Sequence, residues 1–161
     1  MAHISFQGHE EMLKELRKMR QEFGPLARAM IQAGGNAMAD AWRETIRRRG
    51  LVDTGAMLAG VGTTDIKEGD NGLYIDVTSK GTDRTGTRNA EKAFVLNYGT
   101  SRMPATHWVE EAEQLGAPRS TAAMQAVLDA YKATGSIPKA ETNDTYTATG
   151  SGRARRRGRK K

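Results

Sequence analysis

The sequence predicts an α+β protein: N-terminal helices packed on a small, mostly antiparallel sheet, a further C-terminal helix and a disordered basic tail. Apolar residues recur at helical spacing up to Gly50, alternate between Val61 and Val77, and return to helical spacing from Ala105 onwards. The chain has 161 residues, of which 37% are hydrophobic, enough to build one core. We therefore expect a single domain over residues 1–134 and a flexible basic tail over residues 135–161.

Two helices are expected before Gly50. The first is amphipathic and ends at Gly24, and its apolar face carries Met12, Leu13, Leu16, Met19 and Phe23. Pro25 suits the first turn of a second helix, which we expect to be interrupted near Gly34 and Gly35. This helix ends in three arginines, at 47–49, which we interpret as cations at a helix C-terminus, with a ligand site as the alternative.

A β-hairpin is expected next. Residues 61–66 and 73–77 alternate in polarity on either side of a GDNG turn at 69–72. The polar, glycine-rich stretch 79–91 has no periodicity, so we expect a mobile loop between strands.

The rest of the domain is expected to be mainly helical. Residues 94–98 fit either a third strand or a short helix, because the apolar pattern alone does not separate the two. Residues 105–115 and 119–131 then predict two helical segments, separated by Gly116 and Pro118.

The net charge of +6 resides in the tail. Residues 153–161 read RARRRGRKK, and their seven cations are Arg153, Arg155, Arg156, Arg157, Arg159, Lys160 and Lys161. Without these seven, the 25 basic residues fall to 18 against 19 acidic ones, so residues 1–152 carry a net charge near −1. We therefore do not expect a basic DNA-binding domain, and we expect the tail to contact nucleic acid or an acidic protein partner, with a solvated tail that only aids solubility as the alternative.

Composition indicates the cellular compartment in which the protein is expected to be assembled. The chain has no cysteine, which excludes disulfides and thiolate metal sites and fits assembly in a reducing cytoplasm. Apolar runs are only a few residues long, and the first residues, MAHISFQGHEE, lack a basic segment followed by an apolar one. Neither a membrane span nor a signal peptide is expected.

The strongest local match to an enzyme is LVDTGA at residues 51–56. Retroviral-type aspartic proteases present a catalytic carboxylate in such a sequence, where two aspartates share a proton across a dimer. Here the aspartate follows RRRGLV instead of closing a buried strand. We therefore interpret Asp53, Thr54 and Gly55 as a structural turn whose first two residues cap a short helix over 55–58.

Other candidate sites also favour structural interpretations. His3, His9 and His107 lack the spacing of metal ligands. GTDRTGTRN, at 81–89, has neither Walker nor dinucleotide-binding spacing. Acids at 110, 111 and 113 suit a helix N-terminus. No catalytic residue, cofactor or metal is therefore expected.

Two motifs, in order, resemble a family of phage proteins. VDTGAM stands at 52–57 after the basic helix end, and AFVLNYGTSRMPATHWV stands at 93–109 after the hairpin. This arrangement is similar to the tail-component or neck protein family of long-tailed double-stranded DNA phages. The family pattern is Val-Asp-Thr-Gly-Ala-Leu, then an aromatic, an acid and Tyr-Gly-Thr before Met-Pro-Ala-x-Pro-Phe. Met57, the Ala59-Gly60 pair, Asn97, His107 and Trp108 depart from it. The resemblance covers residues 25–115.

The resemblance implies a structural virion protein of the neck or tail-completion complex, which joins head and tail and is assembled in the host cytoplasm. Its partners would be further copies in a ring and other neck, tail-tube or head-completion proteins, with genome DNA in the channel. A tail-terminator ring subunit is the closest alternative. A non-enzymatic DNA-binding accessory protein, acting through the basic tail, is the alternative from another class.

A docking loop is expected within the second motif. Gly99 permits a backbone angle closed to other residues and Pro104 fixes the exit, so the loop holds one shape. The expected docking residues are Tyr98, Gly99, Thr100, Arg102, Met103, Pro104 and Trp108. The alternative is that the aromatic residues here, with Phe94, are core anchors on either side of a turn.

Overall fold

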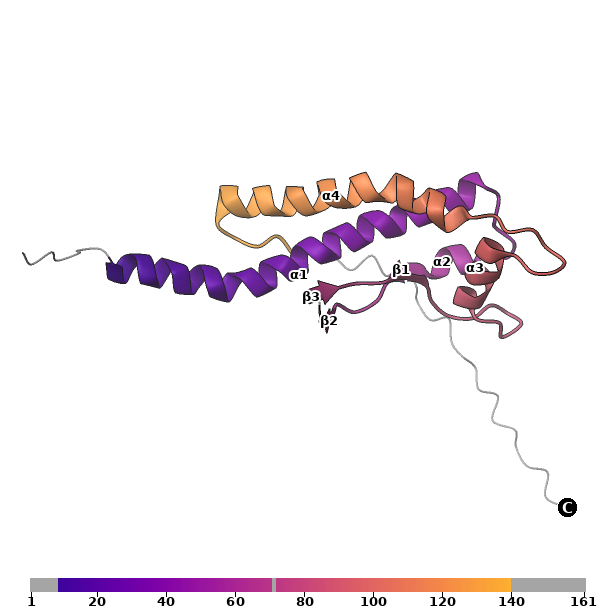
Figure 1. Cartoon of the computed structure of the whole chain (residues 1–161), viewed down its shortest axis with the longest axis horizontal. Helices are drawn as coiled ribbons and strands as arrows, with labels where there is room; N and C mark the ends of the chain where they lie inside the picture. The colour runs from indigo at the N-terminus through magenta and orange to yellow at the C-terminus, as the bar shows by residue number, and fades with distance from the viewer. Residues whose placement is uncertain (1–8, 71, 140–161) are drawn as a thin grey trace, which may run out of the picture.

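A computed structural model describes residues 9–70 and 72–139, without the side chains of residues 9–13, 15–16 and 18–20. Its frame is a pair of antiparallel helices, α1 (His9–Arg48) and α4 (Trp108–Thr134), which lie side by side over most of the length of α4 (Figure 1). Between them in sequence come α2 (Ala56–Gly60), four short strands and α3 (Asn89–Tyr98). The α+β class is confirmed.

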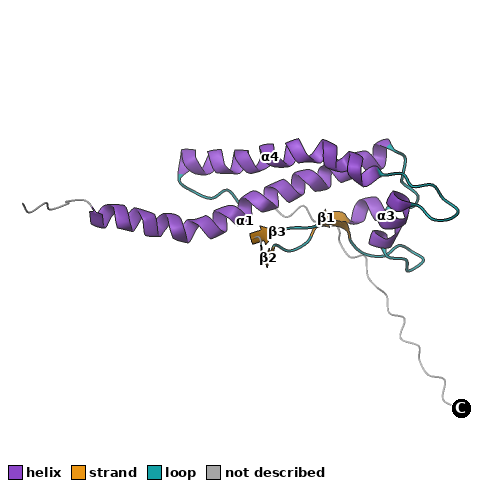
Figure 2. Ribbon diagram, in the orientation of Figure 1, coloured by secondary structure: helices purple, strands orange, loops and turns teal. Residues whose placement is uncertain are grey.

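The strands form one hairpin with an interrupted ladder (Figure 2). At its base β1 (Val61–Thr63) pairs antiparallel with β4 (Val77–Ser79). Nearer its tip β2 (Lys67–Gly69) pairs antiparallel with β3 (Gly72–Tyr74), so the turn falls where GDNG predicts it. All three residues of β1 are buried, because this strand packs against α1.

The predicted break between two N-terminal helices is wrong, since α1 runs unbroken through Pro25. A proline inside a helix removes one hydrogen bond and can bend the helix without ending it. Pro25 is exposed, and Gly24 has no Cβ to clash with the proline ring. Figure 1 shows that α1 bends along its course but continues.

The glycines expected to interrupt the helices act as points of close approach. A Cβ on Gly34 would lie 2.2 Å from Met124 Cε of α4, and one on Gly35 would lie 3.0 Å from Ile75 Cγ2 of the hairpin. On α4, a Cβ at Gly116 would lie 2.4 Å from Met38 Sδ. Tertiary packing therefore holds these glycines inside helices despite their low helix propensity.

The predicted division of the last helical region is also wrong, because α4 continues through Gly116 and Pro118. Because Pro118 has no N–H, the carbonyl of Gln114 loses its helical hydrogen-bond partner. Both residues are exposed, so water can solvate this carbonyl. Thr134 is the last helical residue, and Gly135 closes the helix with a left-handed φ of 65°.

Two further expectations are resolved. Residues 94–98 belong to a helix, α3, and not to a strand. The stretch 79–91, expected to be a mobile loop between strands, instead joins the end of β4 to the start of α3 and is held by its own hydrogen bonds.

The core lies where α1, α4, the base of the hairpin and the two short helices meet. Trp108 is fully buried, and its ring meets that of Trp42 edge-on, with centroids 4.9 Å apart. The other buried apolar residues of this cluster are Ala39, Ile46, Met57, Val61, Ala93 and Ala112. Most of the core therefore lies toward the end of the molecule that carries α2 and α3.

Candidate docking surface

Helix α3 presents one buried face and one exposed aromatic face. Asn89, Ala93 and Asn97, spaced four residues apart, are buried. Phe94 and Tyr98, also four apart, are 63% and 60% exposed, and their rings lie 4.6 Å apart. A helix that buries small and polar residues while it exposes two large aromatic rings is unusual for a surface that meets only water.

The buried asparagines fix α3 to its neighbours. Asn89 donates from Nδ2 to the carbonyl oxygens of Lys80 at 2.7 Å and Ala56 at 3.1 Å, so it ties α3 to β4 and α2. Asn97 Oδ1 accepts a 2.9 Å hydrogen bond from the backbone N–H of Val109, in the first turn of α4. These bonds hold the aromatic face in a defined orientation.

A hairpin-like loop, residues 99–107, follows α3. Thr100 and Met103 pair through backbone hydrogen bonds of 2.8 and 3.3 Å, leaving Ser101 and Arg102 exposed at the tip. The base of the loop is held where Thr106 donates from N and Oγ1 to the carbonyl of Leu96. The loop therefore projects from a fixed base.

Glycine is required at the start of this loop. Gly99 has φ 74° and ψ −173°, a region that glycine alone occupies readily. An added Cβ would also lie 2.6 Å from both the backbone nitrogen of Ala105 and the carbonyl oxygen of Met103. The backbone conformation expected for Gly99 from the sequence is confirmed, while its part in docking stays a prediction.

His107 shows where the chain departs from the resemblance. The phage family carries a proline at this position, whereas His107 has φ 50°. A proline ring holds φ near −65°, so this backbone could not accommodate one. The exit from the loop therefore differs here from what the family pattern would require.

The basic end of α1 contacts the start of α4. Arg48 and Arg49 both pair with Glu111, and Arg49 also donates to the carbonyl oxygen of Thr106 at 2.9 Å. The hydrogen bond from Arg49 lowers the pKa of Glu111. These two arginines therefore join α1, α4 and the loop 99–107, a function that neither interpretation of the arginine triplet anticipated.

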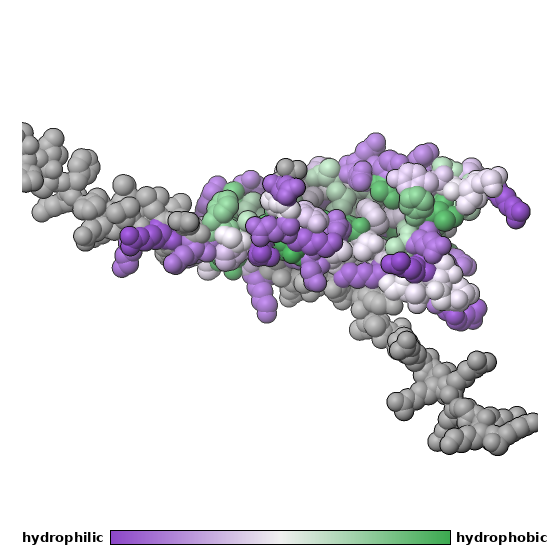
Figure 3. Space-filling model, turned by 60° about the horizontal axis from the view of Figure 1, so that its bottom comes forward, coloured by the Kyte–Doolittle hydropathy of each residue, from purple (hydrophilic) through white to green (hydrophobic). Residues whose placement is uncertain are grey.

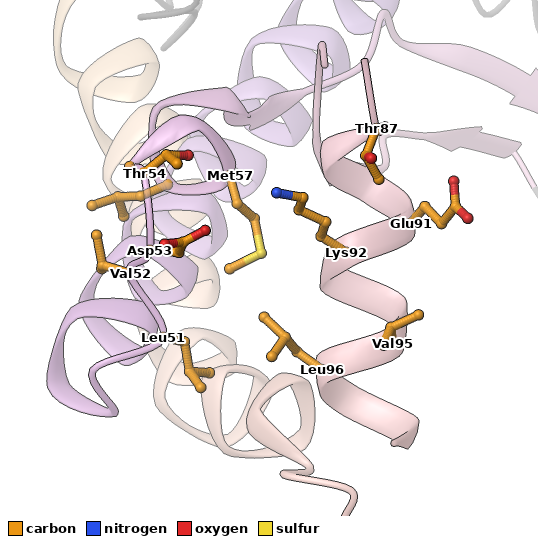
Figure 4. A pocket seen from close by; sticks show the side chains of 12 residues that line it. Leu51, Val52, Asp53, Thr54, Met57, Thr87, Glu91, Lys92, Val95 and Leu96 are labelled. Carbon is orange, nitrogen blue, oxygen red and sulfur yellow. The ribbon is translucent and has the colours of Figure 1, made fainter. Parts of the chain in front are cut away.

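An apolar groove lies beside α3. It has a volume of about 360 Å³ and lies between residues 51–58 and α3 (Figure 4). Its apolar lining consists of Leu51, Val52, Met57, Leu58, Val95 and Leu96. Figure 4 shows Lys92 and Leu96 pointing from α3 toward Met57 and Leu51. The sequence did not predict this groove, because residues 94–98 fit a strand as well as they fit a helix.

The loop 80–88 is organised around Asp83 and lies at one end of the groove. Its Oδ1 accepts hydrogen bonds from the backbone nitrogens of Thr85 at 2.8 Å and Thr87 at 2.9 Å, while Oδ2 pairs with Lys92. The ion pair with Lys92, together with these hydrogen bonds, lowers the pKa of Asp83 far below its usual range.

The expected cap on α2 is not present. The N-cap is Gly55, with a left-handed φ of 79°, and no side chain bonds to it as a cap. Asp53 therefore lies two residues before the position from which a side chain can cap a helix. Thr54 Oγ1 makes only a long, 3.4 Å contact with the backbone nitrogen of Ala56. The turn at 53–55 exists, but its conformation depends on Gly55.

The predicted docking residues divide into two groups. Tyr98, Thr100, Arg102 and Pro104 are exposed, and Gly99 and Met103 are partly buried. Trp108 is wholly buried and donates from Nε1 to the carbonyl of Ala93, so its expected role on the docking surface is wrong and it is a core anchor. The seven cations of residues 153–161 lie outside the described residues.

The described residues form neither a cluster of metal ligands nor a helix suited to span a membrane. No group of three or more histidine, cysteine or acidic side chains there is placed to hold a metal ion. Among the helices of the described chain, none combines the length and apolar character of a membrane span.

Comparison with known proteins gives no relative. No protein-family model matches this sequence, no curated protein matches it, and no solved structure matches the fold.

Proposed function

We propose that this chain is a structural subunit of the neck or tail-completion complex of a long-tailed double-stranded DNA phage, where copies form a ring that helps to join head and tail. One observation carries the proposal. The two motifs that resemble the phage family lie about forty residues apart in the sequence, yet the turn from the first and the helix that opens the second line the same groove.

The surface around this groove suits docking more than catalysis. Phe94 and Tyr98 are exposed aromatic rings of the kind that dominate binding energy at protein interfaces. The neighbouring loop adds Arg102 at its tip, and its base is fixed by hydrogen bonds. Because hydrogen bonds already hold the backbone of α3 and of the loop base, binding would not have to order this backbone.

The decisive experiment replaces the aromatic pair in the phage gene. Phe94→Ala with Tyr98→Ala should leave the fold intact, because both rings are exposed, while the yield of joined particles falls several-fold. Tyr74→Ala is the matched control, since Tyr74 is 44% exposed on the hairpin, away from the groove. Filled heads and separate tails of normal length, seen by electron microscopy, are the expected products of the double variant.

Other products would favour the alternatives. Tails of uncontrolled length would indicate a tail-terminator ring subunit, because such a ring caps the tube. Normal particles from which the chain is absent would refute a virion role, and would leave the DNA-binding accessory protein as the remaining candidate.

A further inference from the structure

The groove beside α3 has room for large apolar side chains. A dry cavity of about 150 Å³ lined by apolar residues can hold a benzene ring, and this groove is more than twice as large, at about 360 Å³. Val52 at its edge is 43% exposed. An apolar surface of this kind is stabilised when a complementary apolar segment excludes water from it.

At the opposite end of the molecule an apolar side chain is exposed on a projecting helix. Helix α1 extends past the end of α4, and this part of it, residues 9–23, is called the α1 extension here (Figure 1). The hydroxyl of Tyr131 donates to Glu22 near the point where α4 stops. The next residue, Phe23, is 71% exposed. Met12, Leu16, Met19 and Phe23 follow one another at intervals of four, three and four residues, the spacing of one helical face.

The apolar surface reflects this arrangement. On the face drawn in Figure 3, hydrophobic residues gather toward the end that carries α3 and beside the place where α1 leaves the rest of the body. The groove and Phe23 lie at opposite ends of the described body, so a contact between them would be heterologous, with different surfaces of two copies meeting.

The chain cannot fill its own groove with this segment. A helix of 40 residues is about 60 Å long at 1.5 Å per residue, and the groove begins at Leu51, just after its C-terminal end. The α1 extension that meets a groove must therefore come from another copy.

The C-terminal residues are long enough but have the wrong chemistry. Residues 140–161 could span about 75 Å when extended. Apart from alanines they contain a single apolar or aromatic residue, Tyr146, and they carry seven cations. Such a segment does not match a groove lined by leucine, valine and methionine.

We propose that the α1 extension of one copy lies in the groove of the next copy, so that the chains associate head to tail. The apolar residues of the extension would enter the groove as a helix does when it presents residues at i, i+4 and i+7 to an apolar surface. The inference deepens the proposed function and rests on it, because a repeated head-to-tail contact that closes on itself is a ring.

Disulfide trapping tests this contact. Because the chain has no natural cysteine, disulfides can form only between the introduced cysteines. Three full-length variants are needed, each with one cysteine: Val52→Cys at the groove, Phe23→Cys on the apolar face of the extension, and Lys14→Cys as the control. Lys14 is exposed and lies nine residues before Phe23, on the opposite side of the helix at 100° per residue.

The mixture of Val52→Cys with Phe23→Cys should form crosslinked heterodimers several-fold faster than the mixture with Lys14→Cys. Equal rates in the two mixtures, or a predominance of Val52-to-Val52 dimers, would overturn the proposal. Crosslinking of Val52→Cys to a different virion protein within assembled particles would also overturn it, because another partner would then occupy the groove.

A second variant removes the contact without a cysteine. Phe23→Glu alters a side chain that is 71% exposed, so the unfolding midpoint should not change while self-association weakens. The proposed function is judged separately, by locating the chain in virions. A chain that crosslinks head to tail but is absent from particles would contradict the function alone, whereas a chain found at the neck without this crosslink would contradict the inference alone.

Discussion

Two aspartates of this protein differ in how much they contribute to its structure. Asp53, in the motif that resembles a protease, makes no ion pair with any described residue, whereas Asp83, in a loop without a motif, organises its surroundings. The difference comes from backbone geometry, because the loop 80–88 turns two N–H groups and Lys92 toward one carboxylate.

Replacing Asp83 with asparagine should destabilise the protein, since the ion pair with Lys92 is lost while the amide oxygen can still accept hydrogen bonds. Asp53→Asn is the control, and its effect should stay within about 0.5 kcal/mol, as for other surface substitutions. Thermal unfolding of both variants at neutral pH would check this. Equal losses of stability would contradict the role assigned to Asp83.

The same pair predicts a pH dependence. The pKa of Asp83 is lowered in the folded protein, so its contribution is fully present above the unfolded value of about 3.9 and is lost as the pH falls below it. The difference in melting temperature between the wild type and Asp83→Asn should therefore be constant near neutrality and shrink below about pH 4. A constant difference down to pH 2 would contradict the assignment.

Gly99→Ala tests the loop 99–107 at its first residue. The variant must adopt a strained backbone conformation and also separate Cβ from backbone atoms 2.6 Å away, so a loss above about 2 kcal/mol is expected. Gly135→Ala shares a positive φ but meets no atom within 4 Å, so it should lose less, about 1 kcal/mol. Urea unfolding of the two variants would measure the difference.

At the scale of elements, the molecule depends on the close approach of α1 and α4. Small residues at the crossing allow it: Gly116 of α4 meets Met38 and Ala41 of α1. Toward the end of α1, Arg119 pairs with Glu44, and the hydrogen bond lowers the pKa of Glu44. This exposed pair contributes little to stability compared with the packing.

Gly116→Ala should therefore destabilise the protein by about 1–3 kcal/mol, although alanine is the better helix former, because the added methyl overlaps Met38 Sδ and the Cβ of Ala41 cannot move aside. A double-mutant cycle with Met38→Ala should show coupling between the two positions. Additive effects would mean that the residues do not compete for the same space.

At the scale of the whole molecule, the excess positive charge lies in the tail, residues 153–161. Because residues 1–152 are close to neutral, sequence-independent binding to DNA should depend on residues 153–161. Seven phosphate contacts would give a slope of log K against log salt of up to about −6. Deleting residues 153–161 should abolish binding without changing the melting temperature, and DNA affinity that survives deletion would place the basic surface elsewhere.

Much of the fold was accessible from local patterns. The change of period at Gly50, the GDNG turn and the return of helical spacing after Ala105 predicted helices around a hairpin, and each was found. The second motif, at 93–109, predicted a loop that needs Gly99. These features follow from residues that are adjacent in the chain, so their sequence is sufficient evidence.

Tertiary structure alone decided the features that local rules misjudged. Prolines and glycines at 25, 34, 35, 116 and 118 predict breaks in the helices. Packing between α1, α4 and the hairpin, or exposure of the affected residues to water, gives the continuous helices the lower free energy. The groove, the exposed Phe94 and Tyr98, and the buried Trp108 likewise depend on which side of each helix another element covers. Sequence defines the apolar faces, but only contacts between segments far apart in the chain determine which of those faces remain open.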